Sequence, residues 1–363
     1  MDERFQAMCS WLESLPLLRE SVFDLPQPAS SDASFRRYFR IVLNQPFRNQ
    51  DSAELGYHND RLIIMDAPPQ HEDCRPFLAV ADTLAQCGLN VPLCLAQDLS
   101  QGFLLLSDLG SQTYLNQLQS DGGRHAESLY SQALDALLQL QTRGQSAAKH
   151  LPLYDAALLE REMDLFVDWL GVRHLERPLN HLQQLQWQEM KRFLIDSAVQ
   201  QPQTYVHRDY HSRNLMCAPG RNPGILDFQD AVFGPLTYDA VSLLRDCYIA
   251  WPAEQVQEWL RAYFLALCQN QLLEQNQWRD FVRAFDLMGI QRHLKAAGIF
   301  ARLWHRDGKD GYLQDIPATL HYILQVGAAY PVLTPLLHWI ESDWLAQVLA
   351  FNAEHFTPSA TAC

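Results

Sequence analysis

The sequence predicts an α+β fold with two lobes, a small sheet-rich lobe over residues 1–110 and a large, mainly helical lobe over residues 111–363. Two observations support this expectation. Strand-like and helix-like stretches alternate before residue 110, and apolar residues recur at helical spacing after it. The chain is also large enough, since 363 residues, of which 48% are hydrophobic, can bury the cores of two such lobes.

In the first lobe, residues 35–43 and 61–65 are rich in aromatic and β-branched side chains, which is typical of strands. The polar segment 44–59 between them predicts a loop. The other elements expected here are helices over 3–15 and 72–87 and a short apolar strand over 103–106.

In the second lobe, apolar residues repeat at the spacing of a helix that buries one face. Such faces are formed by Leu129, Ala133, Leu137 and Leu140, and again by Leu159, Met163, Phe166 and Leu170. Asp155 precedes the second set at the position of a helix N-cap. Two short strands near 214–217 and 224–227 interrupt the helices, which continue to about residue 352.

The formal net charge of −14 argues against a nucleic-acid-binding surface but not against ATP, because a phosphate needs only a local positive site. The acids Asp2 and Glu3 and the lack of an unbroken apolar core argue against a secretory signal. No stretch has the roughly 20 uncharged apolar residues that span a membrane. The eight cysteines include no CxxC pair and are expected to be reduced thiols of a cytoplasmic protein.

Residues 205–214, YVHRDYHSRN, contain the pattern H-x-D-x-x-x-x-N. Phosphoryl transfer to a hydroxyl needs a carboxylate that accepts the hydroxyl proton and a nearby oxygen ligand for magnesium. Asp209 and Asn214 are the right residue types in the right order for these tasks. Taken singly, they fit a loop-capping residue and a turn residue equally well, so the context decides. His207 is expected to brace the loop.

That context is a predicted β-hairpin, because the apolar LMC and GIL stretches flank the turn-rich segment APGRNP. If residue 217 pairs with residue 224, Asn214 lies opposite Asp227. Directly opposed residues have Cβ atoms about 5 Å apart. Asn214 and Asp227 would then be able to share one magnesium ion, and a slip of one residue in the pairing would break this geometry.

These residues resemble the aminoglycoside phosphotransferase-like kinases, a branch of the protein-kinase-like superfamily. HRDYHSRN is similar to the family's catalytic loop, LDFQD to its metal-binding segment, and GPLTYDAVSLLRD to the helix start that follows. Within the family, SDASFRRYFR, MDAPP, EDCRPF and ARLWHRDGK resemble the bacterial anomeric amino-sugar kinases. The resemblance spans about residues 5–330.

The resemblance implies a protein-kinase-like fold and an ATP- and magnesium-dependent enzyme. Its substrate would be N-acetylmuramate or N-acetylglucosamine, phosphorylated at the C1 hydroxyl during peptidoglycan recycling. Asp209 would be the catalytic base in the loop 205–214, and Asn214 and Asp227 would hold magnesium, the latter within the segment 225–230. Asp239 is expected to cap or brace the helix that follows it.

The resemblance also implies a nucleotide site in the first lobe. Ser107, Asp108 and Leu109 would form the hinge, near 107–110, whose main chain binds adenine. The turn Ser31–Arg37, which includes Ser34, would cover the phosphates, although it lacks the glycines of a G-x-G-x-x-G loop.

The first lobe departs from the kinase pattern because it contains no lysine, whereas kinases usually pair the phosphates with a lysine on the third strand. That strand reads LIIMD over residues 62–66. The acid that would partner the lysine, Glu72 or Asp73, is present without it.

An arginine is the expected replacement. On a strand, Arg36, Tyr38 and Arg40 share one face, opposite Phe39 and Ile41, which suit the core. If Tyr38 packs over adenine, Arg40, or Arg36 as second choice, points toward the phosphates, which an arginine fork suits. A solvated basic strand edge is the alternative.

Candidate substrate contacts are Arg213 in the catalytic loop and Arg302, His305 and Lys309 in the basic segment ARLWHRDGK. The basic segment would hold the lactyl carboxylate of N-acetylmuramate. A solvated loop explains the same residues equally well.

Three functions fit the sequence. The first is an amino-sugar C1 kinase, whose acidic anomeric hydroxyl needs only an Asp base. The second is a kinase of an aminoglycoside or amino alcohol, whose cationic substrate would call for a cluster of acids. The third is a non-catalytic nucleotide-binding regulatory protein, and the presence of Asp209, Asn214 and Asp227 together argues against it.

Overall fold

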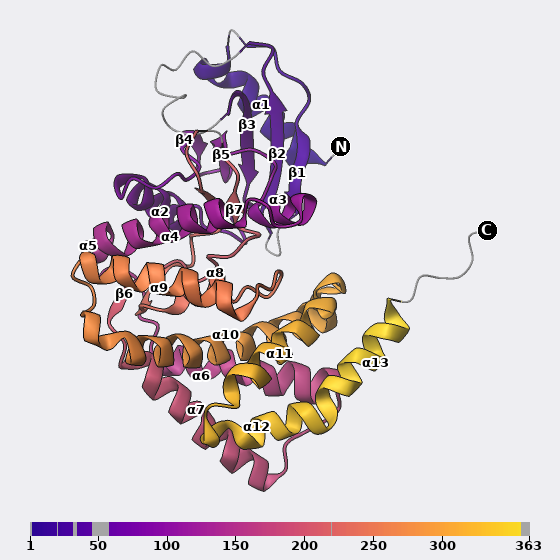
Figure 1. The fold of residues 1–363 in the computed structure, drawn as a ribbon. Helices are drawn as coiled ribbons and strands as arrows, with labels where there is room; N and C mark the ends of the chain where they lie inside the picture. Colours follow the sequence, from indigo (N-terminus) through magenta and orange to yellow (C-terminus); the bar gives the residue numbers. More distant parts are fainter. Residues whose placement is uncertain (1, 20, 32–34, 46–57, 219, 357–363) are drawn as a thin grey trace. The chain divides into compact units, whose positions relative to one another are not determined.

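A computed structural model describes residues 2–19, 21–31, 35–45, 58–218 and 220–356 (Figure 1). The chain divides into two compact units. The first is Met1–Gly144 with Ser212–Ala231, and the second is Gln145–His211 with Val232–Cys363. The boundary at residue 110 between the two predicted lobes depends on the proposed hinge near 107–110, and it stays a prediction.

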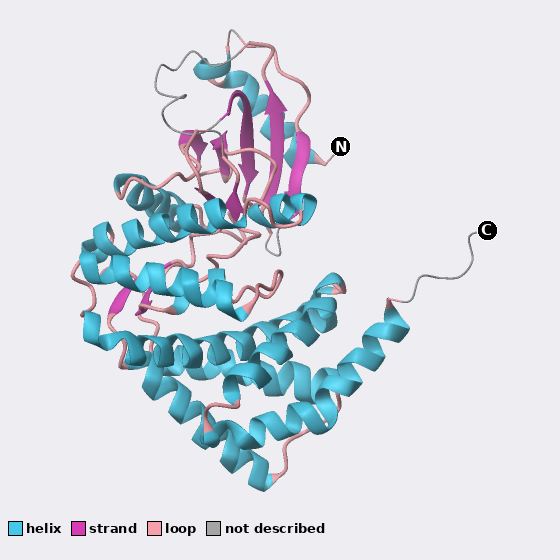
Figure 2. Ribbon diagram, viewed as in Figure 1, coloured by secondary structure: helices cyan, strands magenta, loops and turns pink. Residues whose placement is uncertain are grey.

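The first unit contains a five-stranded sheet with the order β1-β2-β3-β5-β4 (Figure 2). All of its neighbouring strands are antiparallel. The strands are β1 (Gln27–Ser31), β2 (Arg37–Val42), β3 (His58–Asp66), β4 (Cys94–Asp98) and β5 (Phe103–Asp108). The three expected strands are confirmed as β2, β3 and β5.

Sequence reasoning missed β1 and β4, because QPASS and CLAQD lack the β-branched and aromatic residues that mark a strand. The expected loop 44–59 falls largely on 46–57, outside the described residues, and its last two residues already belong to β3.

Helix α1 (Glu3–Ser14) covers one face of this sheet (Figure 1). Its N-cap Asp2 accepts a hydrogen bond from the amide of Phe5 at 2.6 Å, which satisfies a free donor of the first turn. The core between helix and sheet contains Met8, Trp11, Leu12, Phe39, Ile41, Leu62, Ile64, Phe103 and Leu105. Strand alternation therefore places Tyr38 and Arg40 on the opposite face of β2.

The other elements of the first unit are α2 (Arg75–Gln86), α3 (Tyr114–Asp121), α4 (Ala126–Arg143) and the hairpin of β7 (Leu215–Met216) and β8 (Gly224–Ile225). The expected helices over 3–15 and 72–87 are confirmed as α1 and α2. The predicted apolar face of α4 is buried along its length.

The second unit is mainly helical. It contains α5 (Gln145–Ala148), α6 (Ala156–Leu165), α7 (His181–Val199), α8 (Tyr238–Leu244), α9 (Ala253–Gln269), α10 (Trp278–Asp307), α11 (Ile316–Gly327), α12 (Thr334–Trp339) and α13 (Leu345–His355). Two π-helical segments, Phe166–His174 and Ile340–Trp344, follow α6 and α12. Short 3₁₀ turns occur in both units at Pro16–Leu18, Gln275–Gln277, Gly311–Asp315 and Pro331–Leu333.

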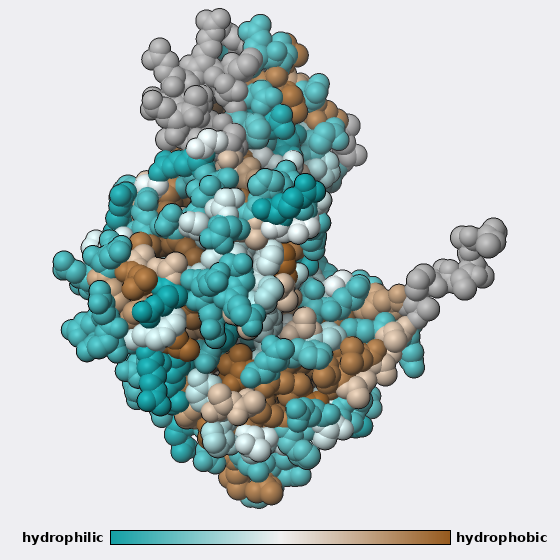
Figure 3. All heavy atoms as spheres, viewed as in Figure 1, coloured by the Kyte–Doolittle hydropathy of each residue, from teal (hydrophilic) through white to brown (hydrophobic). Residues whose placement is uncertain are grey.

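The long helix α10 is the central element of this unit and packs against α6, α7, α8 and α11. Gly298 permits its close approach to the end of α6, because a Cβ at this position would lie 2.4 Å from the carbonyl carbon of Leu165. Asp155 caps α6 as expected, accepting from the amide of Leu158 at 2.8 Å. Figure 3 shows apolar side chains gathered on the surface around α11 and α13.

A two-stranded ladder, β6 (Gln203–Val206) with β9 (Val232–Pro235), lies among these helices and was also missed from the sequence. The loop with the proposed base begins directly after Val206, so this ladder fixes where the loop starts.

In the described part of the chain, no helix is long and apolar enough to cross a membrane. The seven cysteines described are free thiols.

Candidate active site

The loop that follows β6 is held by buried polar groups of the second unit. The amide of Asp209 donates a hydrogen bond to Nδ1 of His207 at 3.3 Å, which confirms the bracing role expected for His207. The carboxylate of Asp239 accepts from the amides of His207 at 2.7 Å and Arg208 at 3.0 Å. Asp239 thus braces the loop. The expectation that it supports its own helix, α8, is wrong, because both oxygens point to the loop.

A buried cluster of charges lies beside this loop, around Glu162 of α6. Its carboxylate pairs with Arg208 at 2.5 Å and with Lys295 at 3.1 Å, and it accepts a hydrogen bond from the hydroxyl of Tyr154. Burial acts to raise the pKa of Glu162, but the charges of Lys295 and Arg208 outweigh it and lower the pKa. Arg208, at φ 78°, is therefore fixed by an ion pair on its side chain.

The carboxyl of Asp209 remains ionised for a related reason. Burial acts to raise its pKa, but the positive charges of Lys295, His211 and Arg208 outweigh burial and lower it. An ionised carboxylate can orient an acceptor hydroxyl and take its proton as the bond to phosphorus forms.

Asp209 opens onto a pocket that lies entirely within the second unit. One face of α10 forms its wall, because Arg292, Lys295, Ala296 and Ile299 follow helical spacing. The other lining residues are His211, Tyr238, Cys247, Tyr248 and Phe300. The pocket thus combines one carboxylate, two cations and an apolar wall, a mixture suited to a small polar ligand.

In the first unit, the hairpin brings together the two predicted magnesium ligands. Nδ2 of Asn214 donates to Oδ2 of Asp227 at 3.2 Å, so the expected proximity is confirmed. The predicted register is wrong by one residue, since Met216 rather than residue 217 pairs with Gly224. Asp227 reaches Asn214 nonetheless because its left-handed backbone, φ 61°, departs from strand alternation.

The predicted hinge residues are anchored by side-chain and main-chain contacts. Ser107 exchanges two hydrogen bonds with Leu93, donating its amide to the carbonyl at 2.9 Å and accepting at Oγ from the amide at 2.8 Å. The carboxylate of Asp108 accepts from Arg40 at 2.6 Å, and Leu109 is buried. These contacts fix the segment, and its adenine role stays a prediction.

The three arginines in and directly before β2 contact four acids, one of which is Asp2, a partner of Arg37. Arg36 pairs with Glu72 at 3.0 Å, and Arg37 pairs with Asp66 at 2.6 Å. Arg40 binds Asp108 at 2.6 Å and also donates to the carbonyl of Gly110 at 2.9 Å. Arg36 therefore pairs with Glu72, one of the two acids expected to lack their usual lysine partner. The alternative acid, Asp73, instead accepts from the amide at the start of α2.

The family described as "Phosphotransferase enzyme family" matches residues 26–278. This match spans the sheet, the hairpin and the loop with Asp209. The chain belongs to this family.

Two relatives are similar in sequence to this chain over most of its length. A Pseudomonas aeruginosa protein named N-acetylmuramate/N-acetylglucosamine kinase is 46% identical over 342 residues, which cover 92% of this chain and 95% of that protein. A Neisseria meningitidis protein of the same name is 39% identical, with 90% and 92% covered. The chain is therefore an enzyme, a small-molecule kinase.

Solved structures of this phosphotransferase type share the fold. An ADP-bound aminoglycoside phosphotransferase has a TM-score of 0.55 at 13% identity, covering 89% of this chain and 98% of its own. A choline/ethanolamine kinase family protein from Mesorhizobium loti has a TM-score of 0.54 at 13% identity, with 95% and 97% covered. The predicted protein-kinase-like α+β fold is confirmed.

The weaker substrate predictions lie away from the pocket. Arg302, His305 and Lys309 are absent from its lining. They belong to the end of α10 and its cap at Gly308, and His305 contacts His174 at 3.2 Å. The alternative of a solvated loop is wrong about the loop, since most of this segment is helical, although His305 and Arg306 are exposed to solvent as it expected. Arg213 is half-buried at the start of the hairpin, and Ser34 lies outside the described residues.

Sequence reasoning missed Arg292 and Lys295, which lie two to three turns earlier on α10. A signal was present, because the four polar residues of QRHLK stand together between the apolar stretches LMGI and AAGIFA, and all four are buried. Buried charges in a core helix are rare unless they are paired or functional.

Proposed function

We propose that this phosphotransferase transfers the γ-phosphoryl group of ATP to the anomeric C1 hydroxyl of N-acetylmuramate or N-acetylglucosamine, in cell-wall recycling. The observation that carries the proposal is the carboxylate of Asp209 at a pocket that Arg292, Lys295 and apolar side chains also line, in a chain 46% identical to a kinase named for these sugars. A cytoplasmic location accords with ATP as the donor and with the free thiols.

In this proposal Asp209 accepts the proton of the C1 hydroxyl as that oxygen attacks phosphorus. A carboxylate with a lowered pKa is a weak base, and an anomeric hydroxyl suits it because it is more acidic than an ordinary alcohol. Glu162 and Asp239 act through the loop and hold Asp209 in place.

The nucleotide role is assigned to the first unit. Tyr38 lies on the sheet face opposite α1 and is the candidate contact to adenine, together with the main chain of Asp108 and Leu109. Arg36 replaces the missing lysine, because it forms the ion pair with Glu72 that the lysine forms in kinases. Arg40 becomes the second choice, since Asp108 and Gly110 already hold its guanidinium.

Asn214 and Asp227 fit a magnesium ion, because their side chains already meet, with Nδ2 of Asn214 3.2 Å from Oδ2 of Asp227, and a flip of the amide would present its oxygen instead. When bound, magnesium neutralises part of the phosphate charge. No group of three or more His, Cys, Asp or Glu side chains within the described ranges is arranged for a metal. The pair would thus rely on phosphate and water oxygens for the remaining ligands.

The pocket argues against the aminoglycoside and amino-alcohol alternatives. Arg292 and Lys295 line it beside a single carboxylate, that of Asp209. A cationic substrate would meet repulsion there, whereas a neutral or anionic sugar would not.

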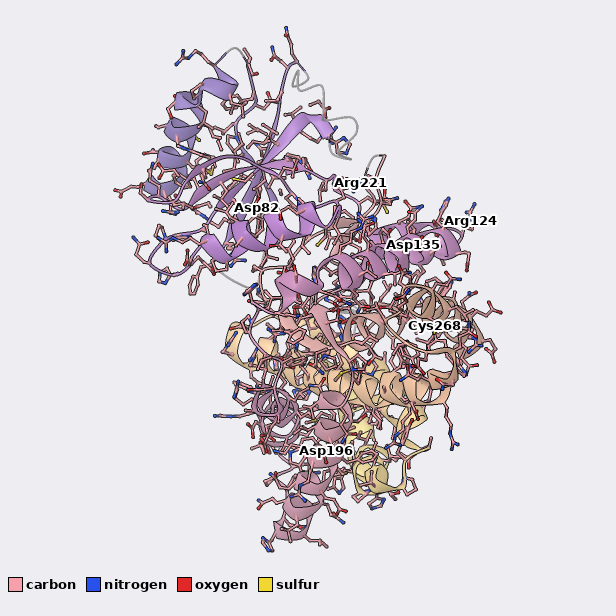
Figure 4. The ribbon with its side chains drawn as sticks, turned by 90° about the vertical axis from the view of Figure 1, so that its left-hand side faces the viewer. Asp82, Arg124, Asp135, Asp196, Arg221 and Cys268 are labelled. Atoms are coloured by element: carbon pink, nitrogen blue, oxygen red, sulfur yellow. The ribbon has the colours of Figure 1, made fainter. Side chains whose placement is uncertain are left out.

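The test is a substrate panel with the purified full chain, ATP and magnesium. N-acetylmuramate, N-acetylglucosamine, kanamycin and choline are compared by ADP release, and phosphorus NMR locates the phosphate on the product. We expect turnover with the amino sugars and a C1 phosphate. Asp209→Asn should lower kcat by about 10²–10⁴-fold without loss of nucleotide binding. Asp196→Asn, an exposed change on α7, is the matched control (Figure 4). Turnover of kanamycin or choline alone would refute the proposal.

A further inference from the structure

Arg292 is a buried cation that forms no ion pair with any of the described residues. Its side chain is almost enclosed, with 6% of the residue exposed. Its guanidinium donates one hydrogen bond, to Sγ of Cys247 at 3.5 Å. Across residues 2–19, 21–31, 35–45, 58–218 and 220–356, no carboxylate oxygen lies within ion-pair distance of it. A thiol is a weak acceptor, so the guanidinium is poorly hydrogen-bonded within the chain. The carboxylates of Asp246 and Asp209 favour its charge, but they act from beyond ion-pair distance.

The neighbouring cations differ from Arg292 in this respect. Lys295 pairs with Glu162 at 3.1 Å and donates to the hydroxyl of Tyr238 at 2.9 Å. Arg208 is paired with the same carboxylate, and Arg245 pairs with Asp286 at 2.7 Å. Arg292 differs from these cations because, in the described part of the chain, no carboxylate directly contacts its guanidinium, which leaves its donors available to an anionic ligand.

The pocket shows where such a partner would bind. Arg292 lines it one turn before Lys295 on α10, and Asp209 lines it as well. Ala296, Ile299 and Phe300 continue the wall with apolar surface. A ligand here can present a hydroxyl to the carboxylate, an anion to the guanidinium and a methyl group to the apolar wall.

N-acetylmuramate has this set of groups. It is N-acetylglucosamine with a lactyl ether at O3, which adds one carboxylate and one methyl group and leaves the C1 hydroxyl unchanged. We propose that Arg292 binds this carboxylate and thereby sets the preference between the two sugars. This inference rests on the proposed function, and it names the residue that determines specificity at the same site.

The experiment compares the two sugars with Arg292→Met, which keeps the length of the side chain and removes its charge. We expect kcat/KM for N-acetylmuramate to fall about 10–100-fold, the effect of losing a hydrogen bond to a charged group. The values for N-acetylglucosamine and ATP should stay within about twofold, because neither ligand offers the carboxylate. Arg292→Lys keeps the charge and should restore part of the loss for N-acetylmuramate alone. If one of the two sugars is bound but not phosphorylated, its affinity is measured as the inhibition constant that it shows in assays with the other sugar, and this constant takes the place of KM.

The matched control is Arg279→Met, at an exposed arginine on the same helix. This variant should leave kcat/KM for both sugars unchanged. Turnover of N-acetylglucosamine by the same preparation reports whether Arg292→Met has folded. An equal loss for both sugars, with or without a rise in the KM for ATP, would overturn the inference and assign Arg292 to the phosphoryl group or to the base. A wild-type enzyme that turns over neither sugar would instead refute the proposed function, and the inference with it.

Discussion

The ion pair between Arg36 and Glu72 leads to a sharp prediction about the nucleotide. Both side chains are largely enclosed, at 11% and 13% exposure, and two guanidinium nitrogens lie 3.0 and 3.1 Å from the same carboxylate oxygen. Glu72 is thus placed to orient Arg36 toward a phosphate. Arg36→Met removes a charged hydrogen bond of about 1.5–3 kcal/mol, which corresponds to a fall of roughly 10–150-fold in kcat/KM for ATP.

The assay varies ATP at saturating sugar and then varies sugar at saturating ATP. The sugar KM should change little, because the lost contact is with the donor. Glu72→Gln should cause part of the same loss, and the double variant should lose less than the sum, since the two residues act as one unit. Arg124→Met, an exposed arginine of the first unit, is the control (Figure 4).

Arg40 provides the outcome that would refute this reasoning. It is held by Asp108 and Gly110, so Arg40→Met should affect ATP kinetics less than Arg36→Met. If only Arg40→Met impairs ATP use, the role of Arg36 is wrong. If both single variants and the double variant keep normal ATP kinetics, the cation comes from elsewhere or is dispensable.

Three further predictions concern single acids of the two units. Asp227→Ala should abolish the magnesium dependence of ATP binding, measured by titration calorimetry. The control Asp135→Ala, at an exposed position on α4 (Figure 4), should keep that dependence. If Asp227→Ala also keeps it, Asp227 is not a magnesium ligand. Glu162→Gln leaves the buried Lys295 and the partly buried Arg208 short of a counter-charge, so urea unfolding should show a loss of about 3–5 kcal/mol in the free energy of unfolding. A loss below about 1 kcal/mol would contradict the network. Burial raises the pKa of Asp239 from 3.8 to about 7, so the folded chain holds a proton that the unfolded chain releases, and stability should fall as pH rises from about 4 to about 7. Asp239→Asn should flatten that slope in thermal melts, and an unchanged slope would assign it to another group.

The sequence by itself determined the local features of this protein. Alternation on β2 placed Phe39 and Ile41 in the core, and the N-cap at Asp155 marked the start of α6. The pattern around Asp209 indicated phosphoryl transfer before any contact was known. These features depend on neighbours a few residues apart, which periodicity and capping rules describe directly.

The tertiary structure decided which distant charges meet. Strand alternation could not rank Arg36 against Arg40, because the ranking depends on acids 36 and 68 positions away. The hairpin pairs one residue away from the expected register, and Asp227 still meets Asn214 because its backbone leaves the strand conformation. Arg292 was overlooked because its importance lies in the lack of an ion-pair partner within the described residues, and only the packing of α10 shows that it lines the pocket.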